Sequence, residues 1–164
     1  MNIEQFYGEI LVPSLDAVAD ICGINVSDEA LCELLTIGQQ ESGLKHRYQI
    51  SSDVHAAGPA RGWFQFERAG GVQGVMKHPS SSERAKALCA ACAVDWNASA
   101  IWRALEGHDL LAVGFARLLL WTDPKPLPKT EQDGWDYYVR NWRPGKPHPL
   151  AWPAYWAASK RLVP

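Results

Sequence analysis

One stretch decides how this chain folds: Leu31-Cys32-Glu33-Leu34-Leu35-Thr36-Ile37-Gly38-Gln39-Gln40-Glu41-Ser42-Gly43. Its small and apolar positions recur at the three- and four-residue spacing of one helix face: Leu31, Leu34, Leu35 and Gly38. This spacing predicts a helix that is buried along that face. Ser27 is suited to cap its start, and Gly43 is suited to end it because a left-handed terminal turn costs glycine little.

Glu41 is the residue of chemical interest in this helix. A glutamate at the C-terminal end of a buried helix meets the partial negative charge of free carbonyl groups and is poorly solvated. Both effects raise its pKa, as a general acid near neutral pH requires. The alternative is a solvated glutamate at a frayed helix end, without a catalytic role.

A second stretch follows after a polar loop: Gly58-Pro59-Ala60-Arg61-Gly62-Trp63-Phe64-Gln65-Phe66-Glu67. Glu41-Ser42 together with Gly62-Trp63-Phe64-Gln65 resemble the Glu-Ser and Gly-Leu-Met-Gln motifs of lytic transglycosylases and goose-type lysozymes. The resemblance covers about residues 28–75. It extends loosely into the C-terminal half, whose tryptophan-rich character is similar to that of small phage lysozyme-like proteins, including endolysins.

The resemblance implies an all-α, lysozyme-like fold with at most a small β element, and an enzyme that cleaves peptidoglycan between N-acetylmuramic acid and N-acetylglucosamine. Glu41 is then the general acid and later the base. Gln65 and the backbone around Phe64 would hold the acetamido group or sugar hydroxyls. Ser42 would hydrogen-bond near the Glu41 carboxylate, and Trp63 would offer a stacking face to a sugar ring.

The sequence departs from the family pattern in one place. Lytic transglycosylases usually carry an Ala-Tyr-Asn motif whose tyrosine approaches the catalytic glutamate, whereas the nearest text here is Phe115-Ala116-Arg117-Leu118. The tyrosine is missing, which leaves open how Glu41 is oriented and whether Arg117 has taken a polar role in the cleft.

The second carboxylate of an ordinary glycosidase has two candidates, Glu67 and Asp53. Glu67 is as easily the acidic residue that starts a helix, and Asp53, like Tyr48 and His55, is as easily a loop residue. The families that the chain resembles commonly use one glutamate with help from the sugar's acetamido group. The attacking group is then water or the muramic acid 6-hydroxyl, and the sequence does not choose between them.

Length and composition limit the alternatives. The 164 residues fit a single domain over 1–164, which we expect to be a monomer, and 47% hydrophobic with 21% charged residues is an ordinary globular balance. A net charge of −2 without a block of like charges argues against nucleic-acid binding. The N-terminus has no signal-peptide pattern, and no apolar run is long enough for membrane insertion.

These features predict a protein that is cytoplasmic on synthesis. To act on the periplasmic cell wall it would depend on a membrane pore made by another protein, a holin, or on delivery in a virion. Two rival functions remain open. One is a lysozyme-fold virion or tail module that binds cell wall with little or no catalysis, and the other is a chitinase-like glycosidase.

We expect no cofactor and no metal. The four cysteines are expected to be reduced, and Cys89-Ala90-Ala91-Cys92 has the spacing of half a zinc site but falls in an alanine-rich helical run. The remaining expected elements are, in order, helix 3–22 interrupted at Pro13, a non-helical segment 44–69 with a strand signal at Trp63 to Phe66, a turn into a short helix at 70–76, a helix capped by Ser81 or Ser82, helices 96–105 and 109–121, an extended connection 122–128, helix 131–142, a turn at 143–147 and a last helix 152–162.

Overall fold

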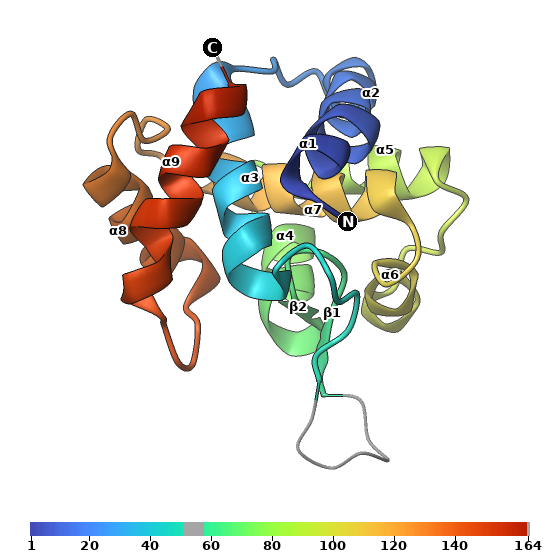
Figure 1. Ribbon diagram of the computed structural model, residues 1–164. Helices are drawn as coiled ribbons and strands as arrows, with labels where there is room; N and C mark the ends of the chain where they lie inside the picture. The colour runs from blue at the N-terminus through green and yellow to red at the C-terminus, as the bar shows by residue number, and fades with distance from the viewer. Residues whose placement is uncertain (51–57, 164) are drawn as a thin grey trace.

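The computed structural model describes residues 1–50 and 58–163. Within them the chain is mainly helical with a two-stranded sheet, so the all-α class with a small β element is confirmed (Figure 1). Asp53 and His55 lie outside the described residues.

The N-terminal segment is helical from residue 3 to residue 22. It consists of α1 (Ile3–Gln5), the π-helical turn η1 (Phe6–Leu11) and α2 (Val12–Cys22). The interruption expected at Pro13 is therefore wrong, because the backbone stays helical through Leu11 and Val12 into α2. The wider turn of η1 precedes it, and the chain continues without a break.

Helix α3 (Asp28–Ser42) carries the stretch that decides the fold. Ser27 caps its start by accepting the N–H of Ala30 at 3.3 Å, and Gly43 ends it with φ +59°, both as predicted. The sequence predicted burial of one helix face only. In the structure every residue from Ala30 to Gln39 is buried, so the helix is buried on all sides over this range. Helix α3 packs against α9, α7 and η1, and Figure 1 shows it between α9 and the N-terminal helices.

The small sheet is a hairpin of β1 (Ala60–Arg61) and β2 (Phe66–Glu67), in which Ala60 pairs with Glu67 and Arg61 with Phe66. The strand expected over Trp63 to Phe66 is wrong for its first three residues, which belong to the turn. The backbone decides this, because Gly62 (φ +75°) and Gln65 (φ +50°) adopt left-handed conformations that a strand excludes. A Cβ at residue 62 would lie 2.7 Å from the Leu105 carbonyl oxygen, so glycine is required there.

The middle of the chain follows the expected order with shifted ends. Its helical elements are η2 (Arg68–Val72), α4 (Gln73–Lys77), α5 (Ser82–Ala91), α6 (Ala98–Ala104) and α7 (Asp109–Thr122). Ser81 stands at the start of α5, but its hydroxyl donates to the Val75 carbonyl instead of capping the helix. Helix α6 begins two residues after the predicted Trp96, at a cap formed by Asn97. Helix α7 is buried throughout residues 111–118, as its apolar sequence predicts.

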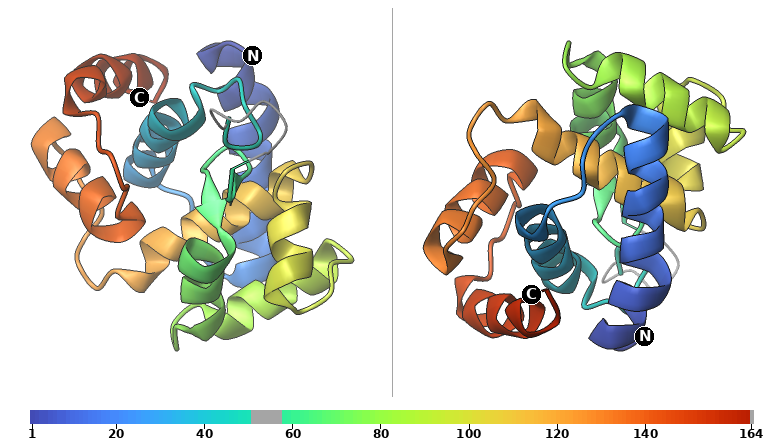
Figure 2. Two further views of the ribbon diagram at one scale, coloured as in Figure 1. Left: turned by 90° about the horizontal axis from the view of Figure 1, so that it is seen from below. Right: turned by 90° about the horizontal axis from the view of Figure 1, so that it is seen from above.

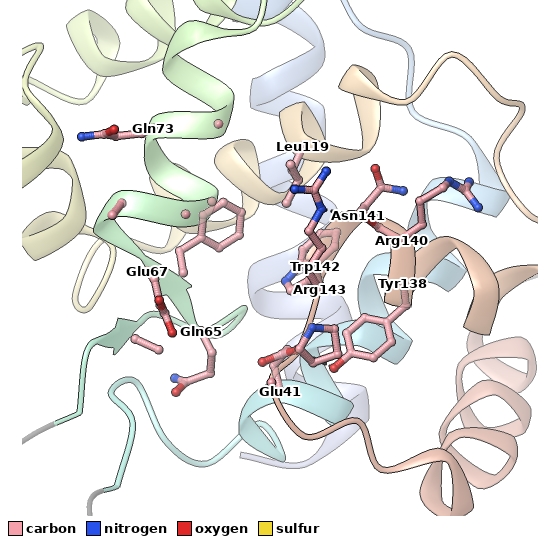
Figure 3. A pocket seen from close by; sticks show the side chains of 18 of the residues that line it. Glu41, Gln65, Glu67, Gln73, Leu119, Tyr138, Arg140, Asn141, Trp142 and Arg143 are labelled. Atoms are coloured by element: carbon pink, nitrogen blue, oxygen red, sulfur yellow. Dashed lines mark hydrogen bonds between the residues drawn. The ribbon is translucent and has the colours of Figure 1, made fainter.

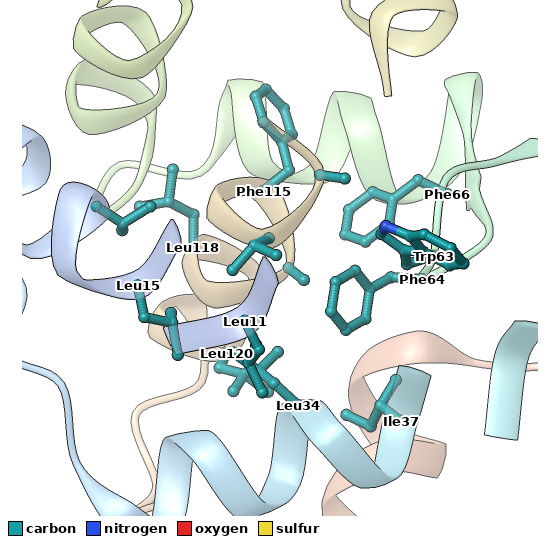
Figure 4. Packing of buried hydrophobic residues seen from close by; sticks show 14 of the residues in the cluster. Leu11, Leu15, Leu34, Ile37, Trp63, Phe64, Phe66, Phe115, Leu118 and Leu120 are labelled. Atoms are coloured by element: carbon teal, nitrogen blue, oxygen red, sulfur yellow. The ribbon is translucent and has the colours of Figure 1, made fainter. Parts of the chain in front are cut away.

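The C-terminal helices α8 (Glu131–Trp142) and α9 (Trp152–Leu162) have the predicted bounds, with the short 3-10 helix Pro149–Ala151 before α9. The core joins side chains from the N-terminal helices, α3, the hairpin and α7, among them Leu11, Leu34, Phe64 and Phe115 (Figure 4). Cys22, Cys32 and Cys89 are buried free thiols, and Cys92 is a partly exposed one. None of the helices in the described ranges is long and apolar enough to cross a membrane.

Candidate functional site

A cavity of about 1170 Å³ lies beside the C-terminal end of α3. One wall comes from the hairpin, η2 and α4, and the other from α8 and the loop 143–148 that follows it. Figure 2 shows these two groups of elements on either side of α3 and α7. The cavity thus joins parts of the chain that are far apart in sequence.

Glu41 occupies the last turn of α3, where the helix reaches the cavity (Figure 3). Burial raises the pKa of Glu41 from 4.5 to about 7, and a hydrogen bond from Tyr138 offsets part of this rise. A carboxyl group with such a pKa is protonated in a large fraction of molecules near neutral pH, which is the state that a general acid needs. The raised pKa expected from the sequence is therefore present in the structure.

Tyr138 of α8 holds this carboxyl group. Its hydroxyl donates to Oε1 of Glu41 at 2.6 Å, and its ring stacks on Trp152 with ring centres 5.2 Å apart. The indole of Trp152 is fixed in turn by a 3.1 Å hydrogen bond to the Glu131 carbonyl. Tyr138 lies in the predicted helix 131–142, but its role beside Glu41 was not predicted. Because Phe115-Ala116-Arg117-Leu118 lacks the family's tyrosine, another tyrosine could be expected to contact Glu41. The sequence around Glu41 does not indicate which one, and Tyr138 lies 97 residues further along the chain.

Gln65 and Glu67 line the wall that faces Glu41 and Tyr138 (Figure 3). The Gln65 amide nitrogen donates to the Gly62 carbonyl at 2.9 Å, which fixes the side chain within the hairpin turn. Glu67 is exposed at the end of β2 and directly precedes η2, so it stands both at the cavity and before a helix. The structure brings these two predicted residues together with Glu41.

Trp63 and Phe64 do not take the predicted roles. Trp63 is only 4% exposed: its indole nitrogen donates to Asp109 at 2.8 Å, and the Arg47 guanidinium lies 4.1 Å from its ring centre. It therefore presents no stacking face to a ligand. Phe64 is buried as well, and its carbonyl accepts the indole N–H of Trp142 at 3.1 Å, so this backbone oxygen is engaged within the protein.

Ser42 and Arg117 are also placed differently from the expectation. The Ser42 hydroxyl is buried, donates to the Gly38 carbonyl at 2.9 Å and accepts the Leu44 N–H, so it closes the helix end instead of contacting the Glu41 carboxylate. Arg117 is buried on α7 and donates to the Asn25 carbonyl at 3.3 Å. It borders a separate pocket of about 300 Å³, so it has no role in the cleft.

Trp142 supplies the aromatic surface that Trp63 does not. It lines the cavity from α8 and meets Phe66 of the opposite wall edge-to-face, with ring centres 5.9 Å apart. It is partly exposed, so part of the indole is open to a ligand. The helix that carries Trp142 was predicted from the sequence, but the sequence did not show that Tyr138 and Trp142 border a cavity.

Across residues 1–50 and 58–163, no group of three or more histidine, cysteine, aspartate or glutamate side chains is arranged to hold a metal ion. Comparison of the chain with protein-family models, with curated proteins and with solved structures finds no match. The features that indicate a function are therefore the motifs and the geometry of the cavity.

Proposed function

We propose that this protein is a lysozyme-like peptidoglycan glycosidase that cleaves the β-1,4 bond between N-acetylmuramic acid and N-acetylglucosamine, with Glu41 as general acid. One observation carries the proposal: a carboxyl group with a pKa of about 7 opens on a large cavity and is oriented by the Tyr138 hydroxyl. The order and spacing of Glu41-Ser42 and Gly62-Trp63-Phe64-Gln65 give independent support.

In the proposed reaction the protonated Glu41 carboxyl donates its proton to the glycosidic oxygen as the bond to the anomeric carbon breaks. Positive charge develops on that sugar ring, and Glu41 is left as a carboxylate. The Tyr138 hydroxyl is already placed to donate to this carboxylate, so it stabilises the charged form as it appears. Glu41 then accepts a proton from the attacking hydroxyl group and returns to its initial state.

The mechanism has two variants, which differ in the group that assists Glu41: the substrate's acetamido group or a second carboxylate. With one glutamate, the substrate's acetamido group stabilises the anomeric carbon, and either water or the muramic acid 6-hydroxyl attacks. With two carboxylates, Glu67 acts from the opposite wall of the cavity. We favour the first variant because Glu67 is exposed, whereas Glu41 is mostly buried.

Substrate contacts in this proposal come from both walls. The partly exposed indole of Trp142 packs against a sugar ring, and the Gln65 side chain hydrogen-bonds an acetamido group or a hydroxyl. Gly74 keeps part of the wall free of side chains, because a Cβ there would meet no atom within 4 Å, and this gives a glycan strand room to lie against the backbone. The site of action in this proposal is the cell wall, reached through a holin pore or by delivery in a virion.

Product analysis tests the proposal. Purified peptidoglycan and chitin oligomers are incubated separately with the protein and with Glu41→Gln, and soluble products are identified by mass spectrometry. We expect muropeptides from peptidoglycan with the wild type alone, with 1,6-anhydro ends if the 6-hydroxyl attacks and reducing ends if water does. Binding without any product would instead indicate a cell-wall-binding module, and turnover of chitin alone a chitinase-like enzyme.

A further inference from the structure

We propose that Arg143 and Lys146 form a carboxylate-binding flank of the cavity and that the substrate is therefore an anionic glycan. This inference rests on the proposed function and narrows its substrate class. The two residues lie on the loop that follows α8, and both line the cavity. Their role would be to hold a carboxylate carried by the glycan while Glu41 meets the bond to be cleaved.

The cavity has a different charge balance from the whole protein. The chain carries 16 lysines and arginines against 18 aspartates and glutamates. The charged side chains that line the cavity are, in contrast, mostly basic: Lys77, Arg140, Arg143 and Lys146 against Glu41 and Glu67. Because the pKa of Glu41 is about 7, the negative charge of the lining is smaller still below that pH.

The four basic residues are not equally free to bind a ligand. Arg140 is engaged, since its guanidinium pairs with Asp123 at 2.7 Å and lies over the Tyr137 ring. Lys77, on the opposite wall, donates to the Gln73 amide oxygen at 3.0 Å. Arg143 and Lys146 pair with no carboxylate among the residues that the structure describes, and both are exposed. The Nε of Arg143 donates to the Arg140 carbonyl at 3.4 Å, a long bond that leaves its two terminal nitrogens for a ligand. They are the cations of the cavity best placed to bind an external anion.

The loop that carries them is held close to the acid. Arg143 takes a left-handed conformation (φ +51°) at the end of α8, and Pro144 and Pro147 restrict the backbone between the two cations and beyond them. The side chain of Gln40, the neighbour of Glu41, donates to the His148 carbonyl at 3.1 Å. This bond ties the far end of the loop to the last turn of α3, so the cations and the acid share one wall region.

The chemistry of the ligand follows from this arrangement. Every muramic acid bears a lactyl ether whose carboxyl group is either free or extended by a peptide with its own carboxylates, whereas a chitin chain is neutral. A guanidinium and an ammonium group beside the cleft gain ion pairs only with the former. The flank would thus distinguish peptidoglycan from chitin before the bond is reached.

A pair of double variants tests the inference. In the Glu41→Gln background, which keeps the ligand intact, Arg143→Gln with Lys146→Gln is compared with Lys160→Gln with Arg161→Gln. The second pair removes the same two kinds of charge from exposed positions of α9 outside the cavity. Calorimetry measures dissociation constants for three soluble probes: a muropeptide glycan with its peptides, the same glycan with the peptides removed, and a chitin oligomer.

We expect the cavity pair to weaken binding of a carboxylated glycan about three- to tenfold, the range of two solvent-accessible ion pairs, and to reduce the dependence of binding on salt. Loss on the peptide-free probe alone assigns the contact to the free lactyl carboxylate, and loss on the peptide-bearing probe alone assigns it to the peptide. Loss on both shows that the flank accepts either carboxylate. The α9 pair and the chitin oligomer should show no change. The inference is overturned if the cavity pair binds the carboxylated probes as the Glu41→Gln parent does, or loses the neutral oligomer equally. If the Glu41→Gln and wild-type proteins bind no glycan at all, the proposed function is wrong as well.

Discussion

Two glutamates on the same helix, Glu33 and Glu41, provide an internal comparison. They are eight residues apart on α3, about 12 Å along the axis. Burial raises the pKa of both, that of Glu33 well above its usual value and that of Glu41 to about 7. Glu33 is fully buried, and neither of its carboxyl oxygens has a hydrogen-bond partner within the described part of the chain. Glu41 has the Tyr138 hydroxyl and the cavity.

The difference between Glu33 and Glu41 shows that a raised pKa identifies a carboxyl group that is shielded from water. It does not by itself identify a catalytic one. Glu33 faces Gly134 and Trp156, and a Cβ at residue 134 would come within 3.0 Å of its Oε2. A substrate has no path to it there. Glu41 combines the same kind of shift with access and with a donor that orients its carboxylate. Single substitutions can change the titratable proton, the access and the orienting donor separately.

The largest effect is expected from the same substitution at the two positions. Glu41→Gln keeps size and shape but removes the proton, so cleavage of a soluble peptidoglycan fragment should fall about 100- to 10,000-fold in kcat. Glu33→Gln is the matched control and should keep near-normal cleavage. If Glu33→Gln folds and loses as much activity as Glu41→Gln, access to the cavity does not distinguish the catalytic glutamate from the buried one.

Tyr138→Phe removes the orienting hydroxyl and keeps the ring that stacks on Trp152. A hydrogen bond to a charged group contributes about 1.5–3 kcal/mol, so kcat should fall about 10- to 100-fold. Because this bond lowers the pKa of Glu41, its loss should raise that pKa, and the decline in rate above about pH 7 should move to higher pH. The pH profile of kcat/KM checks this. A lower rate with an unmoved profile would assign Tyr138 a packing role only.

Gly74→Leu narrows the cavity and so reduces the access of substrate to Glu41. A side chain at residue 74 meets no atom within 4 Å and points into open space, and Gly74 is part of the cavity wall. We expect KM to rise about tenfold, equivalent to about 1.4 kcal/mol of binding free energy, while helix α4 gains from the loss of a glycine. Gly8→Leu, equally open but outside the cavity, is the control for kinetics and for thermal unfolding.

Glu33→Met replaces the buried carboxyl group with an apolar side chain of similar size. Removal of unsatisfied buried polar atoms should stabilise the fold by about 1–3 kcal/mol, measured by urea unfolding. The folded-state pKa of Glu33 is raised, so the contribution of this group to wild-type stability is most favourable below pH 4.5 and is lost as pH rises toward that pKa. The advantage of Glu33→Met should therefore grow between pH 5 and pH 8. A constant advantage would show that ionisation of Glu33 does not contribute.

The smallest effect is expected for Glu67→Gln. With a single catalytic glutamate, this exposed residue contributes only to the surface of the cavity, and the loss in kcat should stay well below the roughly 100-fold of an acid or base. A loss as large as that of Glu41→Gln, in a protein whose circular-dichroism spectrum is unchanged, would replace the one-carboxylate mechanism with the two-carboxylate one.

The sequence predicts the helices of this fold well where local signals mark their ends. Helix α8 begins after Thr130, whose side chain accepts the Asp133 N–H, and α9 follows a proline-rich turn. The hairpin was misread because Trp63 and Phe64 are good strand formers, whereas the backbone angles of Gly62 and Gln65 set the turn. Side-chain propensity and backbone geometry disagreed there, and the backbone decided.

The candidate site was predicted in part. Glu41, Gln65 and Glu67 border the cavity, but their sequence neighbours Ser42 and Trp63 point into the protein. A motif gives positions along the chain and not the direction of each side chain. Tyr138, Trp142 and Arg143 come from α8 and its end, so their approach to Glu41 depends on tertiary packing that no local pattern encodes.

Two hydrogen bonds at the cavity, each between residues far apart in the chain, also order the steps of folding. Tyr138 meets Glu41 across 97 residues of chain, and the Trp142 indole meets the Phe64 carbonyl across 78. Closing such long loops is slower than forming local helices. During synthesis the acid therefore acquires its partner only after α8 has emerged and docked, and a nascent chain that already contains α3 and the hairpin still lacks a finished site.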